Sequence, residues 1–496
     1  MKKILLVYPQ SPATFWSFRY ALKFIAKKSS EPPLGLLTVA AMLPSSWELR
    51  LVDLNISTLN DADLYWADYV FLTGMNVHLT SMKEVIARSR EIGVKVVAGG
   101  PFATSDPQVF EGVDHFILNE AEITLPRFLE DLEKGTPRKF YRSAEYPDLR
   151  LSPNPRWDLL NIKHYANMSV QYSRGCPYNC EFCSITLLNG NKPRTKDTEQ
   201  FLRELDSLYQ LGWRGTVFIV DDNFIGNRRK LKHELLPALI QWSKKNHYPF
   251  SFMTETSINL ADDDQLVDLM VRAGFNSAFI GIETIHEESL NECGKTHNQQ
   301  RDLLTSVKKL QQKGIMVSGG FIVGFDNDPP NIFQKQIEFI QKSGIVTAMI
   351  GLLNAPSGTR LFHRLKSENR LLNIMSGDNM DGSTNFIPKM GYETLRKGYE
   401  EILRKIYAPG DFYQRVKVFL KNYHLPLKTP IRVSWSEIGA LFKSFWILGI
   451  MGKEKRYYWK LLLYSLIRYP TKFPLAVRMA IYGFHFQRVT QSIPQG

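Results

Sequence analysis

The sequence predicts an α/β protein in which two parallel sheets are followed by a mainly helical C-terminal region. Short apolar runs alternate with helical patterns over residues 1–147 and again over residues 161–370, as in parallel sheets with crossover helices. A proline-rich linker, DLRLSPNPRWDLL, separates the two stretches. From residue 371 to residue 496 the pattern is helical and basic. We therefore predict three domains with these bounds.

The composition is that of a folded protein large enough for several cores, with 496 residues that are 44% hydrophobic and 22% charged. It has only four cysteines, three of them clustered, which fits a reducing, cytoplasmic compartment rather than a disulfide framework. The opening MKKILLVYPQSP has too short an apolar run for a signal peptide and fits a buried first strand. No uncharged apolar window of about 18 residues occurs, so we expect no transmembrane helix.

The first domain is predicted to be a doubly wound, Rossmann-like sheet. Its strands are KILLVYP, ELRLVDLN, YVFLTGMN, VKVVAGGP and DHFILNE. Ligands of such sheets bind at the carboxyl ends of the strands. Gly99 and Gly100 end one strand there, and Asn119 and Glu120 end the next. Glycine at a strand end allows a bulky ligand to approach the backbone, although a plain tight turn has the same sequence.

The second domain is predicted to be a partial parallel (β/α)6 barrel. Six strands, MSVQYS, TVFIVDDN, FSFMTETS, NSAFIGIET, IMVSGGFIVGFD and VTAMIGLL, alternate with helical patterns near 197–211, 228–246, 262–273, 299–313 and 331–343. Six such units favour a barrel over an open sheet. In barrels of this kind the active site lies at the carboxyl ends of the strands.

The stretch RGCPYNCEFCS follows the first of these strands and contains Cys176, Cys180 and Cys183. A structural zinc site needs four ligands, and no histidine follows until His233. A redox-active disulfide usually forms between two thiols in C-x-x-C, whereas this loop has three thiols. An iron–sulfur cluster held by three thiolates leaves one iron open to another ligand. We favour the cluster, with zinc and coincidence as the weaker alternatives.

The spacing C-x-x-x-C-x-aromatic-C, here CPYNCEFC, resembles the signature of the radical S-adenosylmethionine (SAM) family. The resemblance implies that the three cysteines bind a 4Fe–4S cluster and that SAM chelates the fourth iron. It also implies an external one-electron reductant of the flavodoxin or ferredoxin type. One electron from the cluster then cleaves SAM to methionine and a 5′-deoxyadenosyl radical, so the cofactor performs the difficult step.

The same resemblance implies a set of contacts to SAM along the barrel. Phe182 is expected near the adenine, and Asp221 or Asp222, in VDDN, replaces the family's glycine-glycine-glutamate segment that binds the amino group. Glu255 and Glu283 fit contacts to the amino group or the ribose, although each fits a barrel-rim ion pair equally well. In GGFIVGFD, the residues Gly320, Ile322 and Gly324 match a G-x-I-x-G pattern behind the adenine, with Asp326 near the position of a missing glutamate.

The N-terminal domain ahead of such a barrel is similar to the cobalamin-binding subclass. Gly99, Gly100 and Glu120 are then candidate cobalamin contacts. Cobalamin mutases carry a cobalt-binding histidine in D-x-H-x-x-G, whereas this chain has NVHLTS around His78. We therefore expect His78 to be an ordinary loop or rim residue and cobalt to have no protein histidine. Cys293 is interpreted as an inert or semi-exposed thiol.

SAM together with cobalamin implies methylation of a carbon too inert for polar chemistry, with no catalytic side chain required. The alternatives are a radical rearrangement or cyclisation without net methylation, and a non-catalytic cobalamin sensor. Retention of all three cysteines argues against the sensor.

The C-terminal region carries 12 lysines and arginines, two acidic residues and 14 aromatics from Lys421 onward. A solvated helical cap and an interfacial surface against anionic lipid both fit this composition; nucleic acid is a weaker alternative because no reading module is present. The full chain resembles a bacterial subgroup that includes the hopanoid C-2 methylases. That resemblance implies a small-molecule or lipid-like substrate and a cytoplasmic protein peripheral to the inner face of the membrane.

Overall fold

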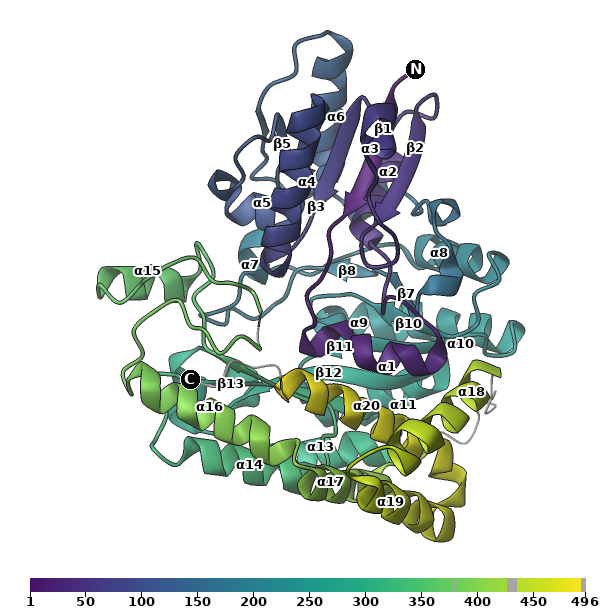
Figure 1. Ribbon diagram of the computed structural model, residues 1–496, viewed down its shortest axis with the longest axis vertical. Helices are drawn as coiled ribbons and strands as arrows, with labels where there is room; N and C mark the ends of the chain where they lie inside the picture. Colours follow the sequence, from purple (N-terminus) through teal and green to yellow (C-terminus); the bar gives the residue numbers. More distant parts are fainter. Residues whose placement is uncertain (379, 426–434, 492–496) are drawn as a thin grey trace.

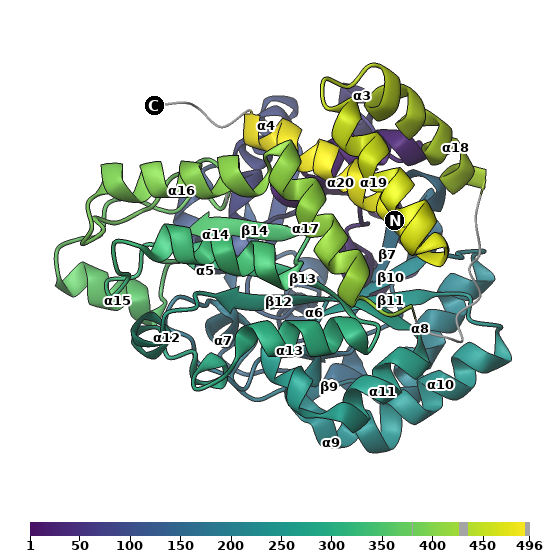
Figure 2. The same ribbon diagram turned by 90° about the horizontal axis from the view of Figure 1, so that it is seen from below.

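The computed structural model describes residues 1–378, 380–425 and 435–491 (Figures 1 and 2). An N-terminal sheet domain lies over a second sheet that curves into a partial barrel, and helices of the C-terminal region pack beside the barrel. The predicted fold class is confirmed.

The first sheet is entirely parallel, with strand order β2-β1-β3-β4-β5-β6. Alternate residues of each strand point to opposite faces, so two cores form, one on each side. Helices α4 and α5 cover one face, and α2 and α6 cover the other. The elements are β1 (Lys3–Tyr8), α2 (Leu34–Met42), β2 (Glu48–Asp53), α3 (Asp61–Trp66), β3 (Tyr69–Thr73), α4 (Leu79–Ile92), β4 (Lys95–Gly99), α5 (Pro101–Ser105), β5 (His115–Ile117), α6 (Ala121–Glu133) and β6 (Phe140–Tyr141).

The second sheet is also parallel, with strand order β14-β13-β12-β11-β10-β7. Its outer face is buried beneath helices, whereas inner-face residues of β11 and β13 stay partly accessible. The strands are β7 (Asn167–Val170), β10 (Thr216–Ile219), β11 (Ser251–Thr256), β12 (Phe275–Glu283), β13 (Met316–Val323) and β14 (Ala348–Leu352). The helices are α8 (Thr198–Gln210), α9 (Arg228–Lys230), α10 (Leu236–Lys245), α11 (Asp264–Ala273), α12 (Glu287–Glu292), α13 (Leu303–Gln312) and α14 (Ile332–Ser343).

The carboxyl end of the first sheet faces the barrel at its edge strand β7. The Tyr165 hydroxyl, just before β7, donates to Asp53 at the end of β2 at 2.9 Å. Arg174, just after β7, reaches Glu120 at the end of β5. Because the carboxyl ends of strands are ligand-binding edges in such folds, a ligand site is expected between the two sheets.

The C-terminal region is helical, as predicted, but we count it from its first helix at residue 360, whereas the sequence predicted a start at residue 371. Its helices are α15 (Arg360–Ser367), α16 (Tyr392–Ile406), α17 (Pro409–Asn422), α18 (Trp435–Ser444), α19 (Lys455–Arg468) and α20 (Phe473–Gln491), with a π-helical turn from Phe445 to Ile450. Helices α16 and α17 pack on α14, and α20 packs on the short helix α1 (Arg19–Leu22). None of the helices in the described ranges combines the length and the apolar content needed to cross a bilayer.

Candidate active site

The cysteine loop leaves the carboxyl end of the barrel between β7 and α8. Cys176, Cys180 and Cys183 lie close enough for a charge on one thiol to affect the next. Burial, followed by the neighbouring thiols, raises the pKa of Cys183 to about 12. The three side chains are half-buried, and a poorly solvated set of thiols gains most from a cation that binds the thiolate form. This donor set therefore fits an iron–sulfur cluster with one ligand from each cysteine.

Two aspartates at the end of β10 hold the beginning of this loop. Asp221 accepts hydrogen bonds from the backbone N–H groups of Tyr172 and Ser173, at 2.8 and 2.9 Å, and from the Ser173 hydroxyl. Burial raises the pKa of Asp221 to about 7 although these hydrogen bonds favour its charged form. Asp222 accepts from the backbone N–H of Gly175 at 2.7 Å and from the Asn189 amide.

Gly175 itself explains the tight entry into the loop. Its φ is +95°, and a Cβ there would lie 3.0 Å from the carbonyl oxygens of Asn189, Gly190 and Lys192. Only glycine fits this conformation without strain. The two predicted aspartates thus support the cysteine loop, and their contact with the SAM amino group stays a prediction.

An ion pair lies beneath the thiols. The Glu283 carboxylate, at the end of β12, contacts the Lys295 Nζ at 2.8 Å, and both side chains are nearly inaccessible to solvent. Gly281 leaves room for them, because a Cβ there would lie 2.2 Å from Glu283 Oε1. The Lys295 ammonium favours the thiolate form at each cluster cysteine. Glu283 therefore orients a cation toward the cluster site, and any contact of Glu283 with SAM stays a prediction.

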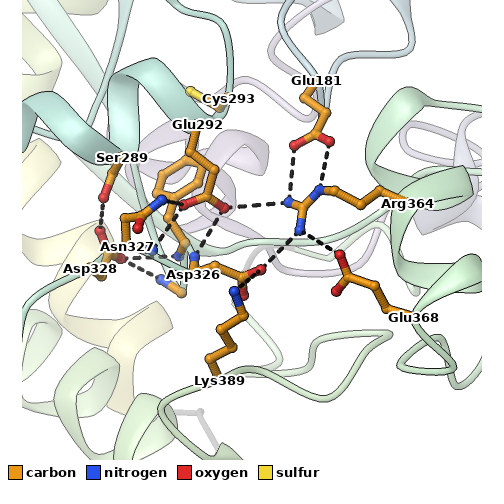
Figure 3. A network of polar contacts seen from close by, with 12 residues as sticks. Glu181, Ser289, Glu292, Cys293, Asp326, Asn327, Asp328, Arg364, Glu368 and Lys389 are labelled. Atoms are coloured by element: carbon orange, nitrogen blue, oxygen red, sulfur yellow. Dashed lines mark hydrogen bonds and ion pairs between the residues drawn. The ribbon is translucent and has the colours of Figure 1, made fainter.

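The turn after β13 is held by a network of charged groups (Figure 3). Asp328 accepts from the backbone N–H of Gly324 at 2.9 Å and from that of Phe325 at 3.1 Å. Glu292 accepts from the N–H groups of Asp326 and Asn327 at 3.0 and 2.9 Å. The turn thus has a fixed shape before any ligand binds.

Arg364, on α15, is the centre of that network. Its guanidinium binds both oxygens of Glu181, at 2.7 and 3.0 Å, and Asp326 at 2.9 Å (Figure 3). Glu181 lies in the cysteine loop between Cys180 and Phe182. Arg364 therefore joins the cysteine loop, the turn after β13 and the C-terminal region through one planar group.

The residues predicted behind the adenine lie at this same end of the barrel. Phe182 packs beside Phe325 with ring centroids 6.2 Å apart. Gly324 has φ +108°, and a Cβ there would meet Leu395 at 2.9 Å. A Cβ on Gly320 would lie 2.7 Å from the Phe279 ring, so that glycine accommodates a neighbouring aromatic side chain. Their contacts with SAM stay predictions.

Asp326, predicted near the position of the missing glutamate, is surrounded by cations. Arg364, Arg370 and Lys389 contact its carboxylate. Burial opposes its ionisation, but the hydrogen bonds from Arg370 and Arg364 outweigh burial and lower the pKa to about 2. Its role is to bind the C-terminal region to the barrel.

The predicted cobalamin contacts lie at the edge of the first sheet. A Cβ on Gly99 would lie 2.8 Å from the Ile117 carbonyl oxygen, and one on Gly100 would lie 2.0 Å from Thr73 Oγ1. The packing of neighbouring strands thus already requires both glycines. Glu120 is engaged by Arg174 and Arg194, each at 2.6 Å. Their contacts with cobalamin stay predictions.

His78 is buried and fully hydrogen-bonded, which is more enclosed than the expected loop or rim position. Its Nδ1 accepts from the Met75 backbone N–H at 3.0 Å, so its Nε2 carries the proton toward Ser11 Oγ at 2.9 Å. Burial lowers its pKa to about 4. His78 is held inside its own domain as a neutral imidazole.

Cys293 is fully buried close to Cys180. Its backbone carbonyl accepts a hydrogen bond from the Glu181 N–H at 2.8 Å. Burial is the main cause that raises the pKa of its thiol to about 12, which agrees with an inert thiol.

The sequence reasoning missed Arg174, Lys295 and Arg364. Arg174 directly precedes Gly175 and Cys176, and this position next to the cysteines could have identified it from the sequence. Lys295 and Arg364 reach the loop from far along the chain, and no local pattern marks them.

Comparison with known proteins agrees with this geometry. Residues 25–129 match the B12 binding domain, residues 170–340 match the Radical SAM superfamily, and residues 359–496 match a domain of unknown function (DUF4070). An uncharacterized methyltransferase of Synechocystis sp. is 41% identical over 99% of this chain and 93% of its own length. The hopanoid C-2 methylase of Rhodopseudomonas palustris is 32% identical over 94% of this chain and 90% of its own length.

A solved structure shows the same fold. The radical SAM methyltransferase TsrM from Kitasatospora setae, with cobalamin and a [4Fe-4S] cluster bound, superposes with a TM-score of 0.65 at 14% identity. The match covers 98% of this chain and 99% of that one.

Together, the two parallel sheets and the three-cysteine loop define a cobalamin-dependent radical SAM enzyme. The chain belongs to the radical SAM superfamily with a B12-binding domain, and within it to the methyltransferases. Its cofactors are a 4Fe–4S cluster, SAM and cobalamin. Like other members, it uses a small-molecule substrate and an external reductant.

Arg364→Ala should weaken cluster binding, because Glu181 in the cysteine loop would lose the guanidinium that binds both of its oxygens. We expect iron to be retained about tenfold less well under a chelator than in wild type, with R364K intermediate because it lacks the planar fork. Iron content and the electron paramagnetic resonance spectrum of the reduced cluster measure the effect. Arg150→Ala, which removes an exposed ion pair, is the matched control. Equal iron retention in R364A and R150A would contradict the role given to Arg364.

Glu255→Gln should change how stability depends on pH. Burial, then the carboxylates of Asp222, Glu31 and Asp221, raises the pKa of Glu255 from 4.5 to about 8. A carboxyl whose pKa is raised on folding destabilises the native state progressively as pH rises through that interval. In cofactor-free protein, E255Q should melt like wild type near pH 4.5 and about 2 °C or more higher near pH 8. A difference that stays constant between these pH values would show that the carboxyl is not perturbed.

Proposed function

We propose that the protein methylates an unactivated ring carbon of a polycyclic triterpenoid that it takes from a membrane surface. The observation that carries the substrate class is the similarity to the hopanoid C-2 methylase over 94% of this chain, at 32% identity. That match extends into the C-terminal region. The partly accessible inner face of the barrel supports an apolar substrate, since it includes Met253, Phe279 and Met349.

The residues of this chain position the reaction rather than perform acid–base chemistry. When bound, the cluster and SAM supply the radical that removes a hydrogen atom, and cobalamin supplies the methyl group. Cys176, Cys180 and Cys183 would hold the cluster, and Lys295 balances the charge of the thiolates. Arg174 keeps the cysteine loop against the first domain, so the two cofactors keep one separation. The barrel wall excludes water from the reacting carbon.

A surface on α18, the following π-helical turn and α19 supports contact with a membrane. We call this the α18–α19 surface. Its apolar side chains are each more than 40% exposed: Phe442, Trp446, Ile450, Met451, Tyr457, Trp459, Leu463, Leu466 and Ile467. Its basic side chains are Lys443, Lys453, Lys455, Arg456, Lys460 and Arg468, against two acids, Glu437 and Glu454.

Such a combination suits the interface of an anionic leaflet. Apolar side chains enter the headgroup region, while lysine and arginine are attracted to the negative surface. Both α18 and α19 lie at the periphery of the molecule (Figures 1 and 2). A monomer rarely leaves so many large apolar side chains exposed together unless they bind something.

The substrate proposal predicts that reconstituted enzyme converts a pentacyclic hopene to its ring-methylated product. The assay contains SAM with a deuterated methyl group, cobalamin and a strong reductant without oxygen, and mass spectrometry detects the labelled product. Cys180→Ala should form neither the product nor 5′-deoxyadenosine. Formation of 5′-deoxyadenosine without methylation of any hopene would reject the substrate and leave the enzyme class intact.

The membrane proposal predicts sedimentation with vesicles of anionic phospholipid that weakens with added salt and with neutral lipid. The triple variant F442S/W446S/L463S should bind about tenfold or more weakly, because it removes the apolar part of the surface. The matched control Y65S/L151S/L187S removes exposed apolar side chains elsewhere and should bind like wild type. Equal sedimentation of both triple variants, or binding indifferent to salt and lipid charge, would contradict the proposal.

A further inference from the structure

The partial barrel has an open side, and one chain segment runs across it. Strands β7 and β14 are the two edges of the sheet and do not pair with each other. The segment from residue 14 to residue 31, which follows β1 of the first domain, contacts both edges. At β7, the backbone N–H groups of Ala166 and Asn167 donate to the carbonyls of Ser29 and Ser30, at 3.0 and 2.8 Å. At β14, the Trp16 indole N–H donates to the Met349 sulfur at 2.9 Å.

Helix α20 packs against this segment and fixes its position. Phe15 stacks on Phe486 of α20 with ring centroids 4.4 Å apart and an angle of 10° between the rings. The His485 ring lies 3.0 Å from the Phe15 carbonyl oxygen and stacks on Phe18. Figure 1 shows α20 running beside α1 across the front of the barrel. Phe15 is 1% exposed, so this part of the segment is a rigid core element.

Trp16, the next residue, contacts the barrel strands. Its ring meets the Phe279 ring edge to face, with centroids 5.0 Å apart and an angle of 85° between them. Phe279 lies on the inner face of β12, because its neighbours Ala278 and Ile280 are completely buried against the outer helices. The indole therefore reaches the barrel interior, yet it is 38% exposed. An aromatic face held rigidly and left uncovered is suited to contact with an apolar ligand.

The side chains around Trp16 favour a flat apolar ligand. Phe279 on β12 and Met349 on β14 lie on the inner face and are partly accessible, as is Ile322 on β13 between these strands. Gly320, opposite Met349 on β13, has no side chain to fill the space, and the atoms nearest its Cβ position belong to the Phe279 ring. Acidic groups lie toward the opposite edge, at Glu31 and Glu255, which influence one another electrostatically. The interior thus has one aromatic side and one acidic side.

We infer that Trp16 determines substrate specificity by forming the substrate-facing wall at the open side of the barrel. The wall limits how wide a polycyclic ring system can be while its reacting carbon lies between the cofactors. The identity of the ligand rests on the proposed function, whereas the position of the wall rests on the contacts of Trp16 alone. Removing the indole enlarges the space for the ligand and also uncovers the Met349 side chain.

The first experiment compares the hopene with a homologue that carries one additional ring methyl group. In Trp16→Ala, the ratio of kcat/KM for the larger over the smaller compound should rise about tenfold or more over wild type, the usual effect of one methyl group in a fitted pocket. Trp16→Phe, with a shorter ring, should move the ratio in the same direction by less and serves if the alanine variant is insoluble. Trp47→Ala removes an indole from the first domain and should leave the ratio unchanged. Methylation by W16A with an unchanged ratio would overturn the inference.

The second experiment requires no substrate. Pulsed hydroxyl-radical labelling of the full chain, read by mass spectrometry, should modify Met349 several-fold more in W16A than in wild type or W47A. Unchanged labelling of Met349 would overturn the inference whatever the substrate is. Increased labelling in W16A, with no hopene methylated by wild type, would support the wall and reject the triterpenoid.

Discussion

The position of the cysteine loop depends on buried charges supplied by its two neighbours. Apart from the two-residue strands and the short helix within it, the loop has little regular structure of its own. Arg174 at its start is held by Glu120 and Glu122 of the first domain, and Glu181 in its middle is held by Arg364 of the C-terminal region. Each ion pair has little exposure to solvent. Removing one partner would leave the other charge uncompensated, at a high cost in folding free energy. A loop fastened in this way can present three thiols in a fixed arrangement.

The same contacts relate the three parts of the molecule to one another. The first domain contributes carboxylates to the beginning of the loop, the barrel contributes Asp221, Asp222 and Lys295, and the C-terminal region contributes Arg364. The cluster site is therefore where all three parts meet. This arrangement suits a reaction that needs two cofactors and a substrate at a common point, because the separation of the cofactors is set by short contacts near the loop.

Much of this organisation follows from local sequence pattern. Alternating apolar strands and amphipathic helices predicted both sheets, since each strand buries its residues with a period that does not depend on distant partners. The closeness of the three cysteines was predicted for a similar reason, because three thiols on one short loop lie near each other in any fold; their binding of the cluster stays a prediction. Glu283 and Asp222 were correctly placed at strand ends, but the sequence does not say that Lys295 and Gly175 bind them. Lys295 and Arg364 act across long sequence separations, and only the folded chain brings them to the loop.

The packing of Phe15 against α20 has a consequence for biosynthesis. His485 and the Phe15 carbonyl are 470 positions apart, so all residues between them must be synthesised before this contact forms. The first domain and the strands of the barrel have the local pairings to assemble during translation. The segment that runs between β7 and β14 is not packed against α20 until α20 has been synthesised. A nascent chain or a product truncated before α20 therefore exposes apolar surface at that edge, where chaperones and proteases act.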